Sequence, residues 1–152
     1  MQQLSDVAKP GMMISQTWPT SRETQGETLR AIETTLKEGF FEALQTVEIP
    51  YSDERRAIAA VIQQEEIPLT YCIARVLNEN HWNLSDLDAV NRKKSWEGAI
   101  RTLDDAREAG AGALALISGP GPVDPGRRPD ALKCLAESIE QVCRAAQAAP
   151  AV

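Results

Sequence analysis

The sequence predicts an α/β fold of four consecutive βα units with parallel strands, which form the first half of a TIM (β/α)8 barrel. Short apolar runs alternate strictly with amphipathic stretches along the 152 residues, and this alternation is typical of a parallel sheet covered by helices. The runs are centred near residues 14, 46, 71 and 115, and their mean separation of about 34 residues is close to the roughly 31 per unit of an eight-unit barrel.

The first predicted unit begins with the apolar run 12–15, which a polar loop follows. A helix is expected next, because its apolar residues recur at spacings of three and four, at Leu29, Ile32 and Leu36. Gly39 is predicted to end this helix, since glycine is common just past the last helical turn. Residues 1–11 are predicted to be an N-terminal extension of a single partial-barrel domain at 12–152.

The second unit has a strand in the run 43–49, which Pro50 closes. Ser52 is expected to cap the following helix, and Asp53 and Glu54 come next, where the positive end of the helix dipole favours carboxylates. This helix is predicted to end near residue 66 and to bury three apolar residues, Ile58, Val61 and Ile62.

The third and fourth units follow the same plan. The run 67–76 is rich in Ile, Thr, Tyr and Val, as strands are. Residues 85–88 resemble a capping box for a helix that ends at Gly110. The fourth run, 113–117, leads into the Gly/Pro-rich loop 118–129, and a last helix follows. The buried faces of these two helices are predicted at Trp96, Ile100 and Leu103, and at Leu132, Leu135, Ile139, Val142 and Ala146.

The second strand decides between a barrel and an open sheet. Its alternation places Val47 and Ile49 on one face and Thr46 and Glu48 on the other. Central strands of an open doubly wound sheet are apolar on both faces, because helices cover both. The polar face therefore favours a barrel lumen. The alternatives are a strand at the edge of a sheet, and an open flavodoxin-like domain that binds a small ligand or a protein without catalysis.

Composition excludes several kinds of partner. The chain carries 16 Lys and Arg against 22 Asp and Glu, for a net charge of −6, which argues against nucleic acid or an anionic membrane as the main partner. No apolar run approaches the roughly 20 residues of a membrane-spanning helix, and the N-terminus lacks the pattern of a secretory signal. The three cysteines form no C-x-x-C pair, and we expect buried thiols in a reducing, cytoplasmic environment.

Four short segments carry a resemblance to a known family. They are Val47–Pro50 (VEIP), Leu84–Asp88 (LSDLD), Ala106–Ala111 (AREAGA) and Leu116–Gly121 (LISGPG). In order and spacing they resemble the first half of the xylose isomerase-like superfamily, from about residue 12 to residue 148. That family contains sugar and sugar-phosphate isomerases and epimerases, inosose dehydratases, hydroxypyruvate isomerases and the endonuclease IV group. The single histidine and the acidic charge argue against the DNA-repair branch.

The resemblance implies an isomerase or epimerase acting on a sugar or related polyol. The family's divalent metal (Mn, Mg, Co or Zn) polarises the carbonyl and hydroxyl oxygens, and two glutamates exchange the proton. The metal ligands come from the ends of the fifth to eighth strands, and no position of this chain matches them. We therefore expect no catalytic residue and no metal ligand in this chain, and no turnover by the chain alone.

The site of a barrel lies at the carboxyl ends of its strands and in the loops that follow. The substrate-binding residues predicted there are Glu48, Arg75, His81, Trp82 and Ser118. Other readings remain open: an internal ion pair between Glu48 and Arg75, a solvated loop histidine at His81, and a hydrophobic lid over the adjacent helix start at Trp82.

The fourth loop allows a contact with an anionic substrate, and the half-barrel fold predicts association between copies of the chain. The pair Arg127–Arg128 could attract an anionic substrate, although such pairs are usually solvated. A half barrel exposes its lumen face and two sheet edges, so we expect a homo-oligomer. One form of it would be two copies that complete a barrel around a binding cavity.

Overall fold

The computed structural model describes residues 9–19, 21–122 and 124–148. Residues 1–8 of the predicted N-terminal extension lie outside this described part. The chain divides into two compact units. The first contains the residues up to Cys72 together with Asp105–Ala115, and the second contains Ile73–Asp104 together with the residues from Leu116 onward.

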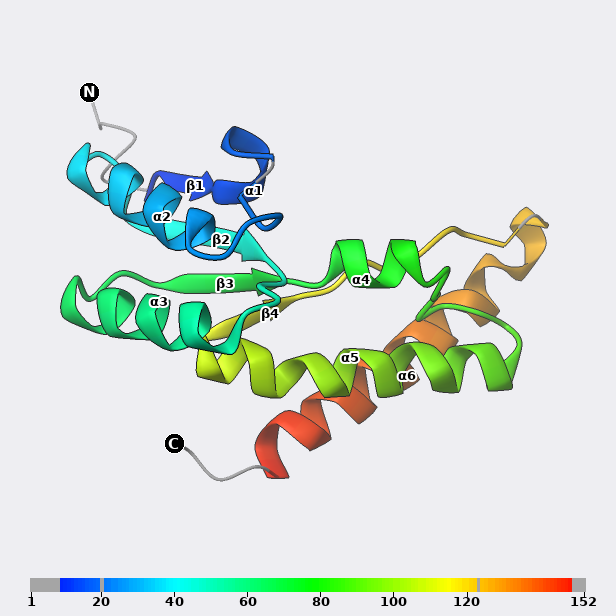
Figure 1. The fold of residues 1–152 in the computed structure, drawn as a ribbon. Coiled ribbons are helices and arrows are strands. Elements are labelled where there is room, and N and C mark those ends of the chain that lie inside the picture. The colour runs from blue at the N-terminus through cyan, green and yellow to red at the C-terminus, as the bar shows by residue number, and fades with distance from the viewer. Residues whose placement is uncertain (1–8, 20, 123, 149–152) are drawn as a thin grey trace. The chain divides into compact units, whose positions relative to one another are not determined.

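The first unit contains one sheet of four parallel strands in the order β1-β2-β3-β4 (Figure 1). The strands are β1 Gly11–Met13, β2 Ala43–Val47, β3 Leu69–Cys72 and β4 Ala113–Ala115. When parallel strands follow one another in sequence order, right-handed crossovers place every connecting helix on the same face. The sequential order confirms the half-barrel prediction. The flavodoxin-like alternative is wrong, because that sheet changes direction part-way along its strand order.

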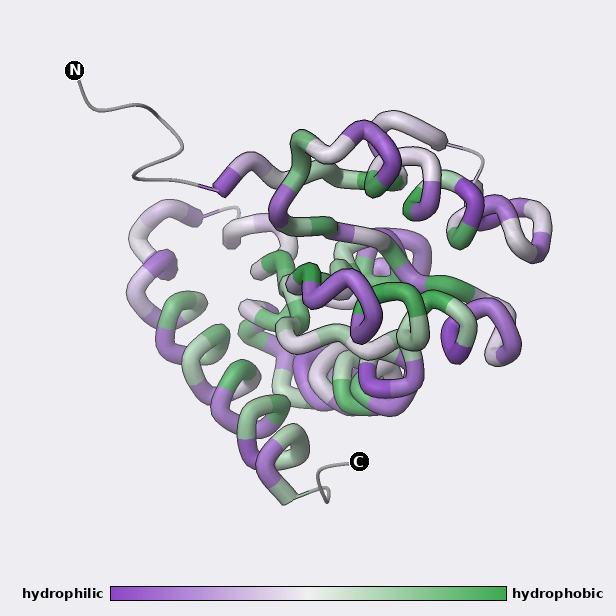
Figure 2. Tube along the Cα trace, turned by 90° about the vertical axis from the view of Figure 1, so that its left-hand side faces the viewer, coloured by the Kyte–Doolittle hydropathy of each residue, from purple (hydrophilic) through white to green (hydrophobic). Residues whose placement is uncertain are grey.

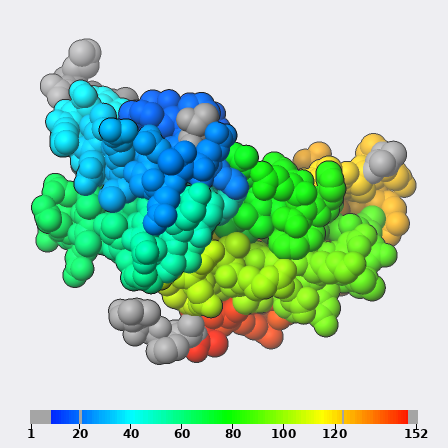
Figure 3. Space-filling model, viewed as in Figure 1, coloured from blue at the N-terminus to red at the C-terminus, as the bar shows by residue number. Residues whose placement is uncertain are grey.

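One face of this sheet is covered and the other is open. The register pairs Leu44 with Leu69 and Thr46 with Tyr71, and all four side chains are buried. The helices α2 (Glu27–Lys37) and α3 (Ser52–Gln64) lie side by side over this face (Figures 1 and 3). Figure 2 shows hydrophobic segments along the sheet strands and hydrophilic ones on the outer turns of the helices.

The prediction that the polar side chains of the second strand face the barrel lumen is wrong for Thr46. Thr46 lies on the helix-covered face and is 2% exposed, and its hydroxyl donates to the carbonyl oxygen of Val47 at 3.1 Å. A threonine whose hydroxyl bonds to a neighbouring backbone carbonyl needs no polar surroundings. The barrel prediction was therefore right, although one of its reasons was not. β2 lies between β1 and β3, so the edge-strand alternative is also wrong.

The caps of the first two helices differ from the expected ones. Gly39 ends α2 with φ 66°, as predicted. The N-terminus of α2 has no cap from its own N-cap residue, Gly26; instead the buried Glu54 of α3 accepts from the Leu29 N–H at 3.0 Å. Ser52 is the first residue of α3 rather than its cap, and its hydroxyl donates to Glu108 at 2.7 Å.

The remaining elements are mainly in the second unit. α4 (Ala74–Glu79) follows β3 almost at once, so the third strand is shorter than its apolar run. α5 (Ala89–Glu108) is capped by Asp88, whose carboxylate accepts from the N–H groups of Val90 and Asn91. The predicted capping box is wrong at its serine, since Ser85 bonds to Asn83 instead. The other short elements are α1 (Ile14–Thr17), in the first unit, and the 3-10 helix η2 (Pro125–Arg127).

The buried faces of the last two helices are narrower than predicted. α5 buries mostly small residues: Ser95, Gly98, Ala99, Thr102, Leu103 and Ala106. Trp96 and Ile100 are only half-buried. In α6 (Arg128–Ala148), the predicted Val142 is buried, whereas Leu132 and Ile139 are 58% and 39% exposed. None of the described helices is long and apolar enough to cross a membrane.

Candidate functional site

The five residues predicted to bind substrate are divided between the two units. Glu48 lies in the first unit, and Arg75, His81, Trp82 and Ser118 lie in the second.

Glu48 comes directly after β2, at the carboxyl end of the strand, as expected. Its side chain is 12% exposed and forms an ion pair with Arg22, whose side chain is 17% exposed. Arg22 belongs to the segment between α1 and α2, which the sequence patterns did not single out. Glu48 is thus a largely buried carboxylate that an arginine holds at the strand end.

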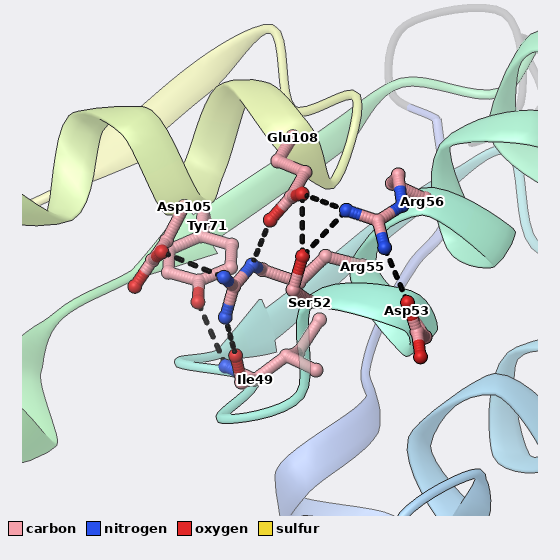
Figure 4. A network of polar contacts seen from close by, with 8 residues as sticks. All are labelled: Ile49, Ser52, Asp53, Arg55, Arg56, Tyr71, Asp105 and Glu108. Atoms are coloured by element: carbon pink, nitrogen blue, oxygen red, sulfur yellow. Dashed lines mark hydrogen bonds and ion pairs between the residues drawn. The ribbon is translucent and has the colours of Figure 1, made fainter.

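A network around Arg55 fixes the loop that contains Glu48 (Figure 4). The Arg55 side chain is 11% exposed. Its Nη1 donates to the Ile49 carbonyl oxygen at 2.6 Å, and its Nε donates to Glu108 Oε2 at 2.7 Å. Its Nη2 lies 3.0 Å from Asp105 Oδ1. One guanidinium therefore joins the end of β2, the start of α3 and the last turn of α5.

Tyr71 holds the same loop from the covered face of the sheet. The Ile49 N–H donates to the Tyr71 hydroxyl oxygen at 2.7 Å, and burial raises the pKa of Tyr71 to about 12. At the outer end of the network, the Ser52 hydroxyl and then Arg55 donate to Glu108 and lower the pKa of its carboxyl. Ile49 is thus held at both its N–H and its carbonyl group. Because Glu48 directly precedes Ile49, these two bonds also fix the backbone position of Glu48.

In the second unit, Asn83 joins two loops. Its N–H donates to Ser95 Oγ at 2.8 Å, and its Nδ2 donates to the Pro120 carbonyl oxygen at 3.0 Å. Its Oδ1 accepts from the N–H of Ser85 at 2.9 Å and from the Ser85 hydroxyl at 2.8 Å. Gly119 passes so close that a Cβ there would lie 2.4 Å from this oxygen. Asn83 therefore sets the path of the loop that carries Ser118.

Ser118 lines a cavity of about 420 Å³. Ser85 and Arg128 also line it, and Leu132 and Leu135 of α6 form part of its apolar wall. Arg127, the other arginine of the predicted pair, lies 3.7 Å from Asp130. The volume suits a small ligand with an apolar face and a few polar groups.

The other predicted residues of this unit do not line that cavity. Arg75 is exposed and donates to Glu79 at 2.6 Å. His81 is exposed, with φ 53°. Trp82 lies against Gly98, and the Arg101 guanidinium carbon is 5.5 Å from its ring centroid. Trp82 therefore packs against the middle of α5 rather than over its start.

A metal does not fit the residues at hand. In the described part of the chain, no three His, Cys, Asp or Glu side chains come together in a way that could hold a metal ion. No step of the chemistry is therefore assigned here to a metal.

Comparison with known proteins places this geometry in a family. The model of the xylose isomerase-like TIM barrel family matches residues 30–151. The chain belongs to this family. Its four sequential βα units are the first half of the family's barrel. A comparison with the curated proteins finds no match.

Several solved structures have a similar fold. D-psicose 3-epimerase from Clostridium cellulolyticum H10, solved with D-tagatose, superposes with a TM-score of 0.68 at 19% identity, over 93% of this chain and 49% of its own. An L-ribulose 3-epimerase gives a TM-score of 0.69 at 21% identity, over 93% of this chain and 47% of its own. A protein from Sinorhizobium meliloti 1021 gives 0.60 at 23% identity, over 93% and 48%. The chain thus spans about half the length of these structures.

Proposed function

We propose that this chain is the substrate-orienting part of a sugar or sugar-phosphate isomerase or epimerase. The observation that carries the proposal is the family match over residues 30–151, and epimerases among the similar structures support it. The substrate-binding residues that we propose are Glu48, Arg75, His81, Trp82 and Ser118. A hydroxyl-rich monosaccharide suits side chains of these kinds, because it offers donors to a carboxylate and acceptors to hydroxyl and guanidinium groups.

Glu48 has the best-defined role. Its carboxylate follows β2, and the loop behind it is held by Arg55 and Tyr71. A carboxylate fixed in this way can accept hydrogen bonds from two neighbouring sugar hydroxyls without losing much side-chain entropy on binding. Ser118 has a comparable setting, because Asn83 fixes its loop beside the cavity.

The proton transfer itself is not assigned to this chain. The family resemblance leads us to propose a divalent metal for the complete enzyme, with ligands other than the described residues, which form no metal-binding cluster. What the chain's own residues contribute is binding and orientation. We therefore expect the purified 152-residue chain to show no epimerisation. Deuterium incorporation from D2O into D-tagatose or D-psicose in the presence of Mn²⁺ would contradict this.

Sugar binding tests the proposal directly. A titration of the ¹⁵N-labelled chain with D-tagatose and D-psicose is expected to shift the amide signals of residues 48–50 and 118–119. Glu48→Gln should weaken binding about tenfold, because a charge-assisted hydrogen bond becomes a neutral one. The matched control is Glu42→Gln, whose side chain is 50% exposed and lies before β2. No shifts with any ketohexose, or equal affinities of the two variants, would refute the role of Glu48.

A further inference from the structure

The ion pair between Arg22 and Glu48 joins a strand end to a segment without regular structure. Glu48 directly follows β2, whereas Arg22 lies between α1 and α2, where the described residues form only turns and bends. A guanidinium on such a segment keeps a carboxylate in one orientation only if the segment is itself held in place. We propose that Thr28 and Glu54 are positioning residues, which fix Arg22 against Glu48 and thereby orient this carboxylate toward the sugar.

Thr28 holds the backbone next to Arg22. Its hydroxyl donates to the Ser21 carbonyl oxygen at 3.1 Å, and Ser21 directly precedes Arg22. Thr28 and Ser21 are both buried, so water does not replace this bond when it is lost. The Ser21 N–H also donates to the Trp18 carbonyl oxygen, at 3.0 Å. Ser21 is therefore held at both of its backbone polar groups.

Glu54 holds the turn of α2 that carries Thr28. Thr28 and Leu29 are the second and third residues of α2, and the Leu29 N–H donates to Glu54 Oε1 at 3.0 Å. Gly26, at the N-cap position, has no side chain to accept this bond. Glu54 is 4% exposed, and the positive end of the α2 dipole stabilises a carboxylate in this position. The first turn of α2, and with it the Thr28 hydroxyl, is thereby tied to α3.

One turn of α3 thus holds both partners of the ion pair. Glu54 acts on Arg22 through the first turn of α2, whereas the adjacent Arg55 acts on Glu48 through the carbonyl group of the following residue. The other carboxylate oxygen of Glu54, Oε2, is buried and has no hydrogen-bond partner in the described part of the chain, so the contact with α2 is what places this side chain. Because both paths begin in the same helical turn, the two charged groups are held relative to each other.

A fixed orientation matters for a ligand with neighbouring hydroxyl groups. A carboxylate that is already oriented loses less entropy when it accepts hydrogen bonds from two such groups than one that rotates freely. The orientation of Glu48 toward a sugar rests on the proposed function, whereas the positioning of Arg22 does not. Each is therefore measured separately.

The exchange with water of the Arg22 guanidinium protons tests the positioning. In the ¹⁵N-labelled chain, the Arg22 Nε–H signal is identified by its absence in Arg22→Lys. Thr28→Val replaces the hydroxyl donor by a methyl group and should make this proton exchange at least about tenfold faster. Thr28→Ser keeps the donor and should leave the rate within about twofold of the original.

Thr35→Val is the matched control. Thr35 is also buried in α2, but its hydroxyl donates to the Ala31 carbonyl oxygen, at 2.9 Å, within the same helix. This variant should leave the exchange rate at Arg22 unchanged. Equal acceleration by Thr28→Val and Thr35→Val, or no acceleration by Thr28→Val, would overturn the proposal.

A second pair of variants decides the matter if Thr28→Val does not fold. Glu54→Gln retains an oxygen that accepts from the Leu29 N–H, whereas Glu54→Met removes the acceptor at a similar side-chain volume. Only Glu54→Met should accelerate exchange at Arg22. Rates that are equal in these two variants, whether fast or slow, would contradict a role for this hydrogen bond.

Sugar affinity tests the orientation of Glu48. Thr28→Val should weaken the binding of D-tagatose or D-psicose about three- to tenfold in the otherwise unchanged chain and less than about twofold in Glu48→Gln, because its effect passes through the Glu48 carboxylate. A loss of the same size in both backgrounds would mean a general structural effect and would overturn the positioning role. If the unchanged chain binds neither ketohexose, the proposed function fails, and proton exchange still decides whether Thr28 and Glu54 position Arg22.

Discussion

At the scale of single residues, Gly98 leaves the space in which the Trp82 ring packs on α5. A Cβ at this position would lie 2.0 Å from the Trp82 ring. Trp82 also lies under the Arg101 guanidinium. The absence of a side chain at Gly98 is therefore what lets the indole pack on α5, and this packing stabilises the conformation of the loop before Asn83.

Gly98→Ala should consequently reverse the usual effect of this substitution. In an open helix it would add about 1 kcal/mol of stability. Here we expect a loss of about 1–3 kcal/mol, because the methyl group collides with a packed ring. Urea unfolding measures the loss, and displacement of Trp82 should shift tryptophan emission to longer wavelength. In Gly112→Ala, where no atom lies within 4 Å of the added Cβ, stability should change by less than about 0.5 kcal/mol.

Tyr71→Phe should destabilise the first unit by about 1–3 kcal/mol, because it leaves the buried Ile49 N–H without an acceptor. The effect should depend on alkaline pH. The pKa of Tyr71 is about 12 in the folded protein against a reference value of 10.0, so the neutral phenol stabilises the fold fully below pH 10 and this contribution falls as pH rises toward 12. The stability gap between wild type and Tyr71→Phe should therefore narrow over that range. A constant gap would contradict the burial of a neutral phenol.

At the scale of elements, Arg55 at the start of α3 joins the loop after β2 to the last turn of α5, where Glu108 is 53 residues further along the chain. It bonds to the loop after β2 and to two carboxylates in the last turn of α5. Its neighbour Arg56 also contacts Glu108, at 2.8 Å, but its side chain is 59% exposed. The two arginines thus share a partner and differ in burial.

Arg55→Ala is expected to lower the free energy of unfolding by about 2–4 kcal/mol, since it removes the Arg55 donor to the Ile49 carbonyl and the ion pairs of a guanidinium whose side chain is 11% exposed. Arg56→Ala is the matched control and should cost less than about 1 kcal/mol, as exposed ion pairs do. Chemical denaturation of both variants gives the comparison. Equal losses would show that burial of the Arg55 guanidinium contributes nothing.

The elements were largely predictable from the sequence, and their caps and partners were not. Apolar periodicity identified the sheet strands and main helices, because burial repeats locally along the chain. The partner of Glu48 is 26 residues away in Arg22, and no local pattern encodes such a contact. Asn83 organises the loop of Ser118, and no pattern in the sequence singled out this residue for that role. Glu48 itself was found because a strand end can be recognised locally, here from the apolar run that Pro50 closes.

At the scale of the whole molecule, strand order determines which amides are protected. β2 and β3 are hydrogen-bonded on both sides, whereas β1 and β4 have one partner each within the described chain. In hydrogen exchange under monomeric conditions, amides of β2 and β3 should exchange at least about tenfold more slowly than those of β1 and β4. Equal protection in the four strands of a monomer would contradict the sheet order.

The hydrogen bond from the Leu29 N–H to Glu54 makes the folding of α2 depend on that of α3. α2 precedes α3 in the chain, yet the acceptor at its N-terminus is 25 residues further on. During synthesis from the N-terminus, α2 leaves the ribosome before the carboxylate that completes its first turn. An isolated helix of 11 residues is marginal in water. Stable α2 should therefore arise only once β2 and the start of α3 have emerged, so that the segment 27–64 folds as one cooperative step.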